Sequence, residues 1–217
     1  MEAKAPAAGR TSDELGDDDR DTASETKALA EARARTMELE LELSSLANLY
    51  VASFQLASTL RLEGVVTHLH ELLTQLIGAH SYGVYFVNRD GDALVPIRAF
   101  GTSLEPIPVS ELPDENPAST AILAAFRNGH TDVASGDFAT RSSGTPIACV
   151  PLRLESAIVG VVAVFELHPH KTSFSAIDHP LFNLLGTHAA GALVSSELFA
   201  RAGGKVPPAE DFRKAMD

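Results

Sequence analysis

Two apolar segments, separated by a short polar break, form the clearest pattern in the chain. The first covers residues 146–154 and the second covers residues 158–167, and β-branched and other apolar side chains dominate both. This composition predicts two strands joined by a tight turn. Neither segment alternates cleanly between apolar and polar positions, so both faces of both strands should be covered. We therefore expect this hairpin at the centre of a sheet, with helices on each side.

The segments upstream of the hairpin show helix and strand patterns in turn. Residues 65–77 place their leucines and valines on one broad helical face. Residues 81–88 and 93–100 have the composition of strands, and Asp90-Gly91 between them is a strong hairpin signal. A proline-containing loop should follow the second of these strands.

A short helix and a polar loop precede the central hairpin. Asn116 is predicted to be the N-cap of a helix that runs to about residue 127 and ends at Asn128-Gly129. Residues 130–134 should form a short strand. Residues 135–145 contain few apolar side chains, and we expect them to be the most mobile loop of the domain.

The last predicted helix follows the hairpin. It covers about residues 181–200, and Ser175 with Asp178 makes a pair like a capping box before it. Pro180 disturbs the first turn, so Asp178 is a candidate cap. Beyond this helix, residues 202–217 are predicted to be a flexible tail with a short helix from Ala209.

Residues 24–62 have the composition of one long helix. Ala, Glu, Leu, Arg and Met dominate it, and neither Gly nor Pro interrupts it before Gly64, which we interpret as its stop. Apolar residues recur in alternating steps of three and four, as in coiled coils. A helix this long cannot pack entirely on a small domain, so we expect it to pair with the same helix of a second subunit. The alternative is that only the part from residue 43 onward packs, on its own sheet. The residues predicted to form the dimer seam are Leu39, Leu43, Leu46, Tyr50 and Leu60.

Composition and charge exclude several classes of protein. The 217 residues suit one domain with appendages, and the net charge of −12 argues against binding to nucleic acid. No apolar run reaches the ~18 residues that a membrane span needs, and the N-terminus lacks the features of a secretory signal. We therefore predict a cytoplasmic, bacterial protein without a membrane partner, whose residues 1–23 form a disordered acidic tail.

The order of these segments resembles a GAF domain, a small-molecule sensor module common in bacterial signalling. The resemblance covers residues 43–201 and rests on the strand with Val150-Pro151-Leu152, the strand with Ile158-Val159-Gly160-Val161, and the helix start Phe174-Ser175-x-x-Asp178. It implies an α+β fold with a central antiparallel sheet of about five to six strands and helices on both faces. The long coiled-coil helix would precede this domain, and in GAF dimers the last helix often bundles with the first.

The resemblance also implies where a ligand would bind. In GAF domains the ligand lies between the sheet and the short helix and loops on one face, here residues 116–127 and 135–145. Such a pocket needs apolar walls and a few fixed polar groups. Arg98 is costly to bury unpaired, so it should meet an acid, a ligand or water, or extend past the strand end. The side chains predicted to reach the pocket are Tyr85, Arg98, Phe100, Asp132, Phe138, Arg141 and Cys149.

The signature of cyclic-nucleotide-binding GAF domains is only partly present. Its pattern is Asn-Lys…Phe-x-x-x-Asp-Glu, and Lys171, Phe174 and Asp178 match it, whereas His170 and His179 replace the Asn and the Glu. We interpret the matching part as architectural, with Phe174 packed in the core and Asp178 capping a helix or pairing with Lys171.

Cysteine and histidine chemistry has little support in the sequence. Cys149 is the single cysteine and lies on a predicted strand, whereas bilin-binding GAF domains of phytochromes need a reactive cysteine in the ligand cover, and GAF-type methionine sulfoxide reductases need more than one. Haem would need an axial histidine, for which His130 is the one candidate near the pocket. His168 and His170 lack a third ligand for a metal. We therefore predict no metal site and no catalytic residues, and the cofactor stays unknown.

Two interpretations of function follow. The first is a non-catalytic, dimeric GAF signalling module that senses a small ligand and relays the signal to a partner protein in trans. The second is a dimeric GAF-fold scaffold or interaction protein with no small-molecule ligand. We expect no enzyme activity under either interpretation.

Overall fold

The computed structural model describes residues 12–110, 116–134, 138 and 144–216, and the chain divides into two compact units, residues 1–47 and 48–217. The first described element is the long helix α1 (Ser12–Ala57). This confirms the long N-terminal helix, although α1 begins before the predicted start at residue 24. The predicted disordered tail of residues 1–23 is wrong for residues 12–23, whose backbone belongs to α1, and residues 1–11 lie outside the described residues.

The prediction that this helix ends at Leu62 and is stopped by Gly64 is wrong. Helix α1 ends at Ala57, because the Ser58 hydroxyl donates a hydrogen bond to the Gln55 carbonyl and the Arg61 N–H donates one to Thr59 Oγ1. Such local bonds compete with the helical ladder. Gly64 lies inside the next helix, α2 (Leu62–Glu71), where a Cβ would come within 2.8 Å of the Thr59 side chain. The glycine is therefore needed for close approach, not for termination.

The second unit is built on a sheet of six strands in the order β3-β2-β1-β6-β5-β4, with every neighbouring pair antiparallel. The predicted central hairpin is confirmed, because β6 pairs with both β5 and β1 and its middle residues are buried. The turn after β5 is tight, and Glu155 adopts a φ of 53° there. The strands are β1 (Ala79–Val87), β2 (Ala93–Phe100), β3 (Ile107–Pro108), β4 (Asp132–Val133), β5 (Ala148–Leu154) and β6 (Ala157–Leu167).

Helix α3 (Pro117–Asn128) begins and ends at the residues that the capping signals in the sequence indicate. Asn116 caps α3, since its side-chain oxygen accepts a hydrogen bond from the Ala118 N–H, and Gly129 ends the helix in the left-handed region with a φ of 64°. Two π-helical segments continue neighbouring α-helices. The π-helical segments are η1 (Leu72–Ile77), which follows α2, and η3 (Leu185–Ala189), which follows α4. The other α-helices are α4 (Asp178–Leu184), α5 (Ala190–Arg201) and α6 (Ala209–Met216).

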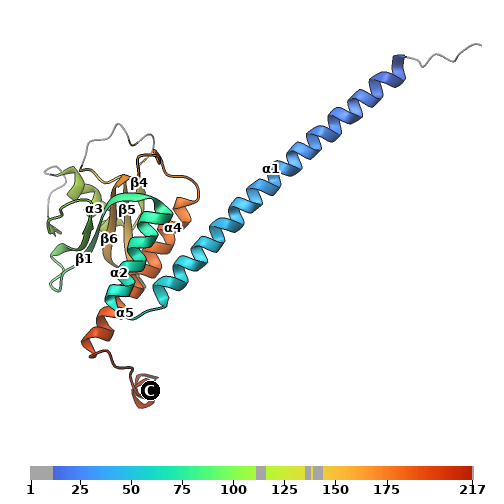
Figure 1. The fold of residues 1–217 in the computed structure, drawn as a ribbon. Helices are drawn as coiled ribbons and strands as arrows, with labels where there is room; N and C mark the ends of the chain where they lie inside the picture. The colour runs from blue at the N-terminus through green and yellow to red at the C-terminus, as the bar shows by residue number, and fades with distance from the viewer. Residues whose placement is uncertain (1–11, 111–115, 135–137, 139–143, 217) are drawn as a thin grey trace, which may run out of the picture. The chain divides into compact units, whose positions relative to one another are not determined.

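Two hydrophobic cores lie on opposite faces of the sheet (Figure 1). The larger core joins the sheet to α2, η1, α4, η3 and α5, and it also includes Ala52 and Leu56 near the end of α1. The smaller core joins the other face of the sheet to α3. The sheet is thus covered on both faces, as the unbroken apolar runs of β5 and β6 predict.

An ion pair between Lys171 and Asp178 links the end of η1 to the start of α4. Lys171 Nζ donates to Asp178 Oδ1 at 2.7 Å and to the Ile77 carbonyl at 2.6 Å. Asp178 Oδ2 also accepts from the N–H and the hydroxyl of Ser175, at 2.6 and 3.0 Å. Asp178 therefore pairs with Lys171, which is one of the two alternatives raised by the sequence. The other alternative, a helix cap, is wrong, because Asp178 is the first residue of α4 and the N-cap is Ile177 without a side-chain cap bond.

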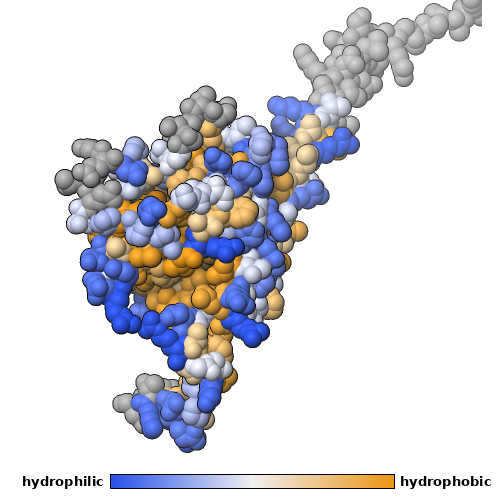
Figure 2. All heavy atoms as spheres, turned by 60° about the vertical axis from the view of Figure 1, so that its left-hand side comes forward, coloured by the Kyte–Doolittle hydropathy of each residue, from blue (hydrophilic) through white to orange (hydrophobic). Residues whose placement is uncertain are grey.

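The surface of the second unit carries an apolar area that hydrophilic residues border (Figure 2). Strand β2 contributes to the exposed apolar surface through Val95, Ile97 and Phe100, which are 37%, 48% and 39% exposed. Within the described part of the chain, no helix is long and apolar enough to cross a membrane.

Candidate functional site

A cavity of about 860 Å³ lies beside the sheet face that packs against α3. Strands β1 and β6 form one wall, the first turn of α3 forms another, and the loop of residues 102–110 forms a third. A volume in this range suits a small organic ligand. Its lining residues are Tyr85, Thr102, Ser103, Leu104, Glu105, Pro106, Ile107, Pro108, Ser110, Asn116, Pro117, Ala118, Ser119, Ile122, Gly144, Thr145 and Phe165.

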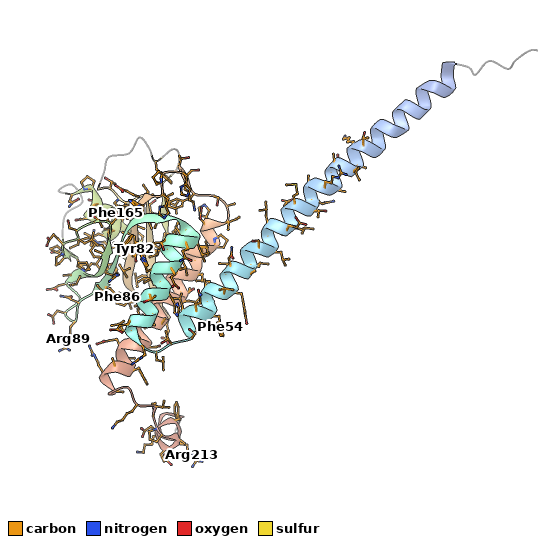
Figure 3. All side chains as sticks on the ribbon, viewed as in Figure 1. Phe54, Tyr82, Phe86, Arg89, Phe165 and Arg213 are labelled. Atoms are coloured by element: carbon orange, nitrogen blue, oxygen red, sulfur yellow. The ribbon has the colours of Figure 1, made fainter. Side chains whose placement is uncertain are left out.

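Side chains alternate between the two faces along the central strands, and this alternation determines which strand residues line the cavity. Tyr82 and Val84 of β1 belong to the core under the helices, so Tyr85 lies on the α3 face. Phe165 of β6 packs against that same α3-side core (Figure 3). Gly83 leaves room on this face, since a Cβ there would overlap the end of the Leu104 side chain. Leu104 can therefore bring its loop down over β1.

The loop that closes the cavity is held at both ends. Gly101 starts it with a φ of 68°, a conformation that favours glycine. Its other end forms the short edge strand β3, where Ile107 pairs with Leu94. The Val109 N–H then donates to the Asp92 carbonyl at 2.7 Å, and Arg127 of α3 donates to the Val109 carbonyl. These bonds fix the loop to both β2 and α3.

Two hydroxyl groups are accessible at the cavity wall. The residues that carry them, Tyr85 and Ser119, are 3% and 7% exposed, and neither hydroxyl makes a hydrogen bond to any of the described residues. Among the described residues no buried side-chain polar atom lacks a partner, so these two hydroxyls are open to the cavity rather than enclosed in the core. Water or a ligand in the cavity can therefore bond to them.

Burial raises the pKa of the Tyr85 hydroxyl from 10.0 to about 12, and the nearby Cys149 and Glu105 side chains add smaller contributions to the rise. The side chain is therefore neutral at physiological pH and can both donate and accept a hydrogen bond. Burial also raises the pKa of the Cys149 thiol, so the thiol stays protonated and a poor nucleophile.

The raised pKa of Tyr85 predicts a loss of stability at alkaline pH. Between pH 10 and about 12 the folded protein keeps a proton that the unfolded chain releases. Because the folded state binds more protons in this window, the free energy of unfolding should fall as the pH rises through it. Denaturant unfolding at a series of pH values measures this slope. Tyr85→Phe should flatten it, and parallel curves for the variant and the parent protein would contradict the assignment.

The structure separates the residues that the sequence predicts for the pocket. Tyr85 lines the cavity, and its ligand role stays a prediction. Cys149 belongs to the core behind the cavity but does not line it, and Asp132 lies opposite Cys149 on the short strand β4. Arg141 lies outside the described residues.

Of the other predicted pocket residues, Arg98 and Phe100 lie on the sheet face opposite α3, and Phe138 packs against the larger core on that same side. Phe100 stacks on Tyr82 with ring centroids 5.7 Å apart. Burial raises the pKa of the Tyr82 hydroxyl, and the nearby Arg98 guanidinium offsets part of that rise. Arg98 therefore meets a tyrosine, a partner that the sequence did not identify. Phe138 packs against Phe174, with ring centroids 5.1 Å apart. None of these three predicted residues lines the cavity.

Sequence reasoning missed most of the cavity wall. Ser119, Ile122 and Phe165 lie on predicted elements, but their facing depends on the packing of α3 against the sheet. Glu105 lies in a loop whose prolines signal restriction without showing which way the loop folds. The amphipathic spacing of α3 is the one signal from which Ser119 and Ile122 follow, since they lie three residues apart on one helical face.

The histidines do not form a metal centre among the described residues, and no group of three His, Cys, Asp or Glu side chains is arranged to hold a metal there. The rings of His168 and His170 stack with an interplanar angle of 2° and centroids 5.7 Å apart. His80 lies 5.5 Å from His168 by the same measure. Stacked rings do not converge on one ion.

Several solved structures share this fold. The GAF domain of a phosphoenolpyruvate-protein phosphotransferase from Coxiella burnetii matches with a TM-score of 0.55 and 13% identity, covering 76% of this chain and 98% of that chain. The corresponding domain from Acinetobacter matches at 0.54 and 12%, covering 75% and 98%. Free methionine-R-sulfoxide reductase from Neisseria meningitidis, solved with its substrate, matches at 0.51 and 19%, covering 69% and 88%. At these identities the likeness shows the fold alone.

The sequence gives the family independently. No curated protein sequence matches the chain. The model of the GAF domain, however, matches residues 61–194, which is more than half of the 217 residues and includes the sheet, α3 and the cavity. The chain therefore belongs to the GAF domain family.

Proposed function

We propose that this protein is a non-catalytic, dimeric GAF signalling module that binds a small ligand in the cavity and relays its presence to a partner protein. The observation that carries the proposal is the cavity itself, whose wall combines apolar side chains with the accessible hydroxyls of Tyr85 and Ser119. The described lining residues include no His, Cys or Lys, so they offer no nucleophile beside a basic partner. Binding is therefore the role that this wall supports.

The central strands provide a route from the cavity to the helices. In β1, Tyr85 faces the cavity while its neighbour Val84 packs under the helical layer. In β6, Phe165 faces the cavity while its neighbour Val164 packs under the helical layer. A ligand that shifts these strands would also shift the core that contains Leu56 of α1. Because packed cores rearrange between discrete states, a small displacement can change the packing of a helix.

The dimer rests on the exposed apolar residues of α1. The predicted seam stays a prediction, and its four residues on α1 are open in the single chain: Leu39 is 62% exposed, Leu43 70%, Leu46 63% and Tyr50 72%. Leu60 lies beyond the end of α1 at Ala57, so the helix does not carry the predicted seam that far. Exposed leucines at coiled-coil spacing favour pairing with a second copy of the same helix.

Amide hydrogen exchange tests the ligand-binding part of the proposal. The protein would be incubated with a protein-free small-molecule extract of cells and compared with the same protein in buffer. We expect slower exchange in residues 102–110 and in the first turn of α3, because a bound ligand would hold the cavity walls closed. Ser119→Phe, which places a bulky ring in the cavity where the Ser119 hydroxyl lies, should abolish the difference. Equal exchange in the extract and in buffer would contradict ligand binding and favour a scaffold.

The seam predicts that a charge at Leu43 breaks the dimer. Leu43→Glu should raise the dimer dissociation constant by at least roughly 10-fold, because the carboxylate would be buried against an apolar partner. Leu41→Glu is the matched control, since Leu41 is similarly exposed at 59% but lies off the seam. Sedimentation equilibrium measures both variants. Equal effects of the two substitutions, or a monomeric parent protein, would contradict the seam.

A further inference from the structure

The charge of the cavity wall indicates which ligands it can accept. Glu105 is the one charged residue among the described lining residues, which include no Lys, Arg or His. Its carboxylate makes no ion pair or hydrogen bond with the described residues. It is also close enough to the Tyr85 hydroxyl for its charge to act on that group. Glu105 is exposed, so the rim of the cavity carries a negative charge that makes no ion pair with the described residues, near the buried ring of Tyr85.

The nearest positive contributions do not cancel this charge. The N-terminus of α3 lines the cavity at Asn116 and Ser119, and a helix end carries about half a positive elementary charge, against the full negative charge of a carboxylate. The Arg127 guanidinium is not part of the wall and donates to the Val109 carbonyl. Among the described lining residues, an anion entering the cavity would thus face a like charge, and no cation of that wall offsets it.

The rest of the wall suits the body of an organic cation. Tyr85 and Phe165 supply aromatic rings, against which a positively charged nitrogen is attracted. Leu104, Ile107 and Ile122 supply apolar surface for carbon atoms. The Tyr85 hydroxyl, which makes no hydrogen bond with the described residues, has lone pairs for an N–H donor.

We propose that the cavity selects a small organic cation: an aromatic or apolar body carrying an ammonium or protonated ring nitrogen that pairs with Glu105. The inference rests on the proposed function and narrows its ligand to one chemical class. It also accounts for the incomplete cyclic-nucleotide signature, since a phosphate-bearing ligand would meet the carboxylate and no lining cation among the described residues.

The test uses three probes that share one ring system. Tryptamine carries an ammonium group, indole carries no charge, and indole-3-propionate carries a carboxylate. Isothermal titration calorimetry with the full chain should give the tightest binding for tryptamine, by roughly 10-fold over indole-3-propionate. Glu105→Gln should remove this preference while keeping the binding of indole. Glu63→Gln is the matched control, because Glu63 lies on α2, on the sheet face opposite α3 and the cavity. This variant should keep the preference.

Each other outcome overturns the inference in a distinguishable way. If indole-3-propionate binds as tightly as tryptamine, or if Glu105→Gln leaves the preference unchanged, the ligand class is wrong while a binding cavity remains. If none of the three probes binds, the proposal of an aromatic cation also fails. In that case the hydrogen-exchange experiment with cell extract still decides separately whether the cavity binds any small molecule.

Discussion

Replacing Gly160 with alanine will destabilise the protein by about 3 kcal/mol or more. Gly160 lies in the central strand β6, opposite Phe86 of β1, and a Cβ at this position would overlap the backbone carbonyl oxygen of Tyr85. Overpacking a well-filled site usually costs about 1–3 kcal/mol, and here the obstacle is backbone, which cannot rotate away. Strands β1 and β6 would have to move apart, which would disturb their hydrogen bonds and the packing of both cores.

Urea denaturation measures this loss, and a second glycine provides its control. Gly191 lies in α5, and a Cβ there would meet nothing within 4 Å. Gly191→Ala should therefore stabilise the protein by about 0.5–1 kcal/mol, because alanine is the better helix former. If Gly160→Ala were as harmless as Gly191→Ala, the described register between β1 and β6 would be wrong.

Replacing Asp178 with alanine will lower the free energy of unfolding by about 3 kcal/mol. The carboxylate is 3% exposed and accepts hydrogen bonds from Lys171 and from Ser175. Its removal leaves the partly buried Lys171 ammonium without its counterion. Breaking a buried pair on one side costs about 3–5 kcal/mol, and the 25% exposure of Lys171 moves the expectation toward the lower end.

An exposed ion pair of the same length is the control for Asp178. Arg201 and Glu197 also approach to 2.7 Å, but their side chains are 64% and 50% exposed. Glu197→Ala should cost no more than about 0.5 kcal/mol, since water screens this helical pair. Thermal or urea unfolding compares the two variants under the same conditions. Similar losses for both would show that Asp178 is not the buried link between η1 and α4.

The sequence predicts the sheet and its helices because long apolar runs leave little freedom. Residues 158–167 have no polar face, so they must lie in the middle of a covered sheet, and β6 does. The two-residue strand β3 carries no such run, and it exists because Ile107 pairs with Leu94. Gly64 was misinterpreted because its role depends on contact with Thr59 across a turn, which the sequence alone does not reveal.

The candidate site is less predictable than the fold for the same reason. Tyr85 follows from strand alternation, because a residue on a central strand must face one of the two cores. Whether a strand residue faces α3 or the other helices depends on which helix covers which face. That choice places Phe100 and Arg98 away from the cavity. Glu105 belongs to a loop whose path is fixed by bonds to Asp92 and Arg127, which are distant in sequence.

Native mass spectrometry tests the central claim most directly, because it weighs the dimer and any ligand together. The gently purified protein would be measured intact and again after denaturation. We predict a dimer with an additional mass that leaves on denaturation, and we predict that Ser119→Phe keeps the dimer but loses this mass. A dimer without additional mass, even after incubation with cell extract, would contradict the ligand-binding role of the cavity. A monomer would contradict the pairing of α1.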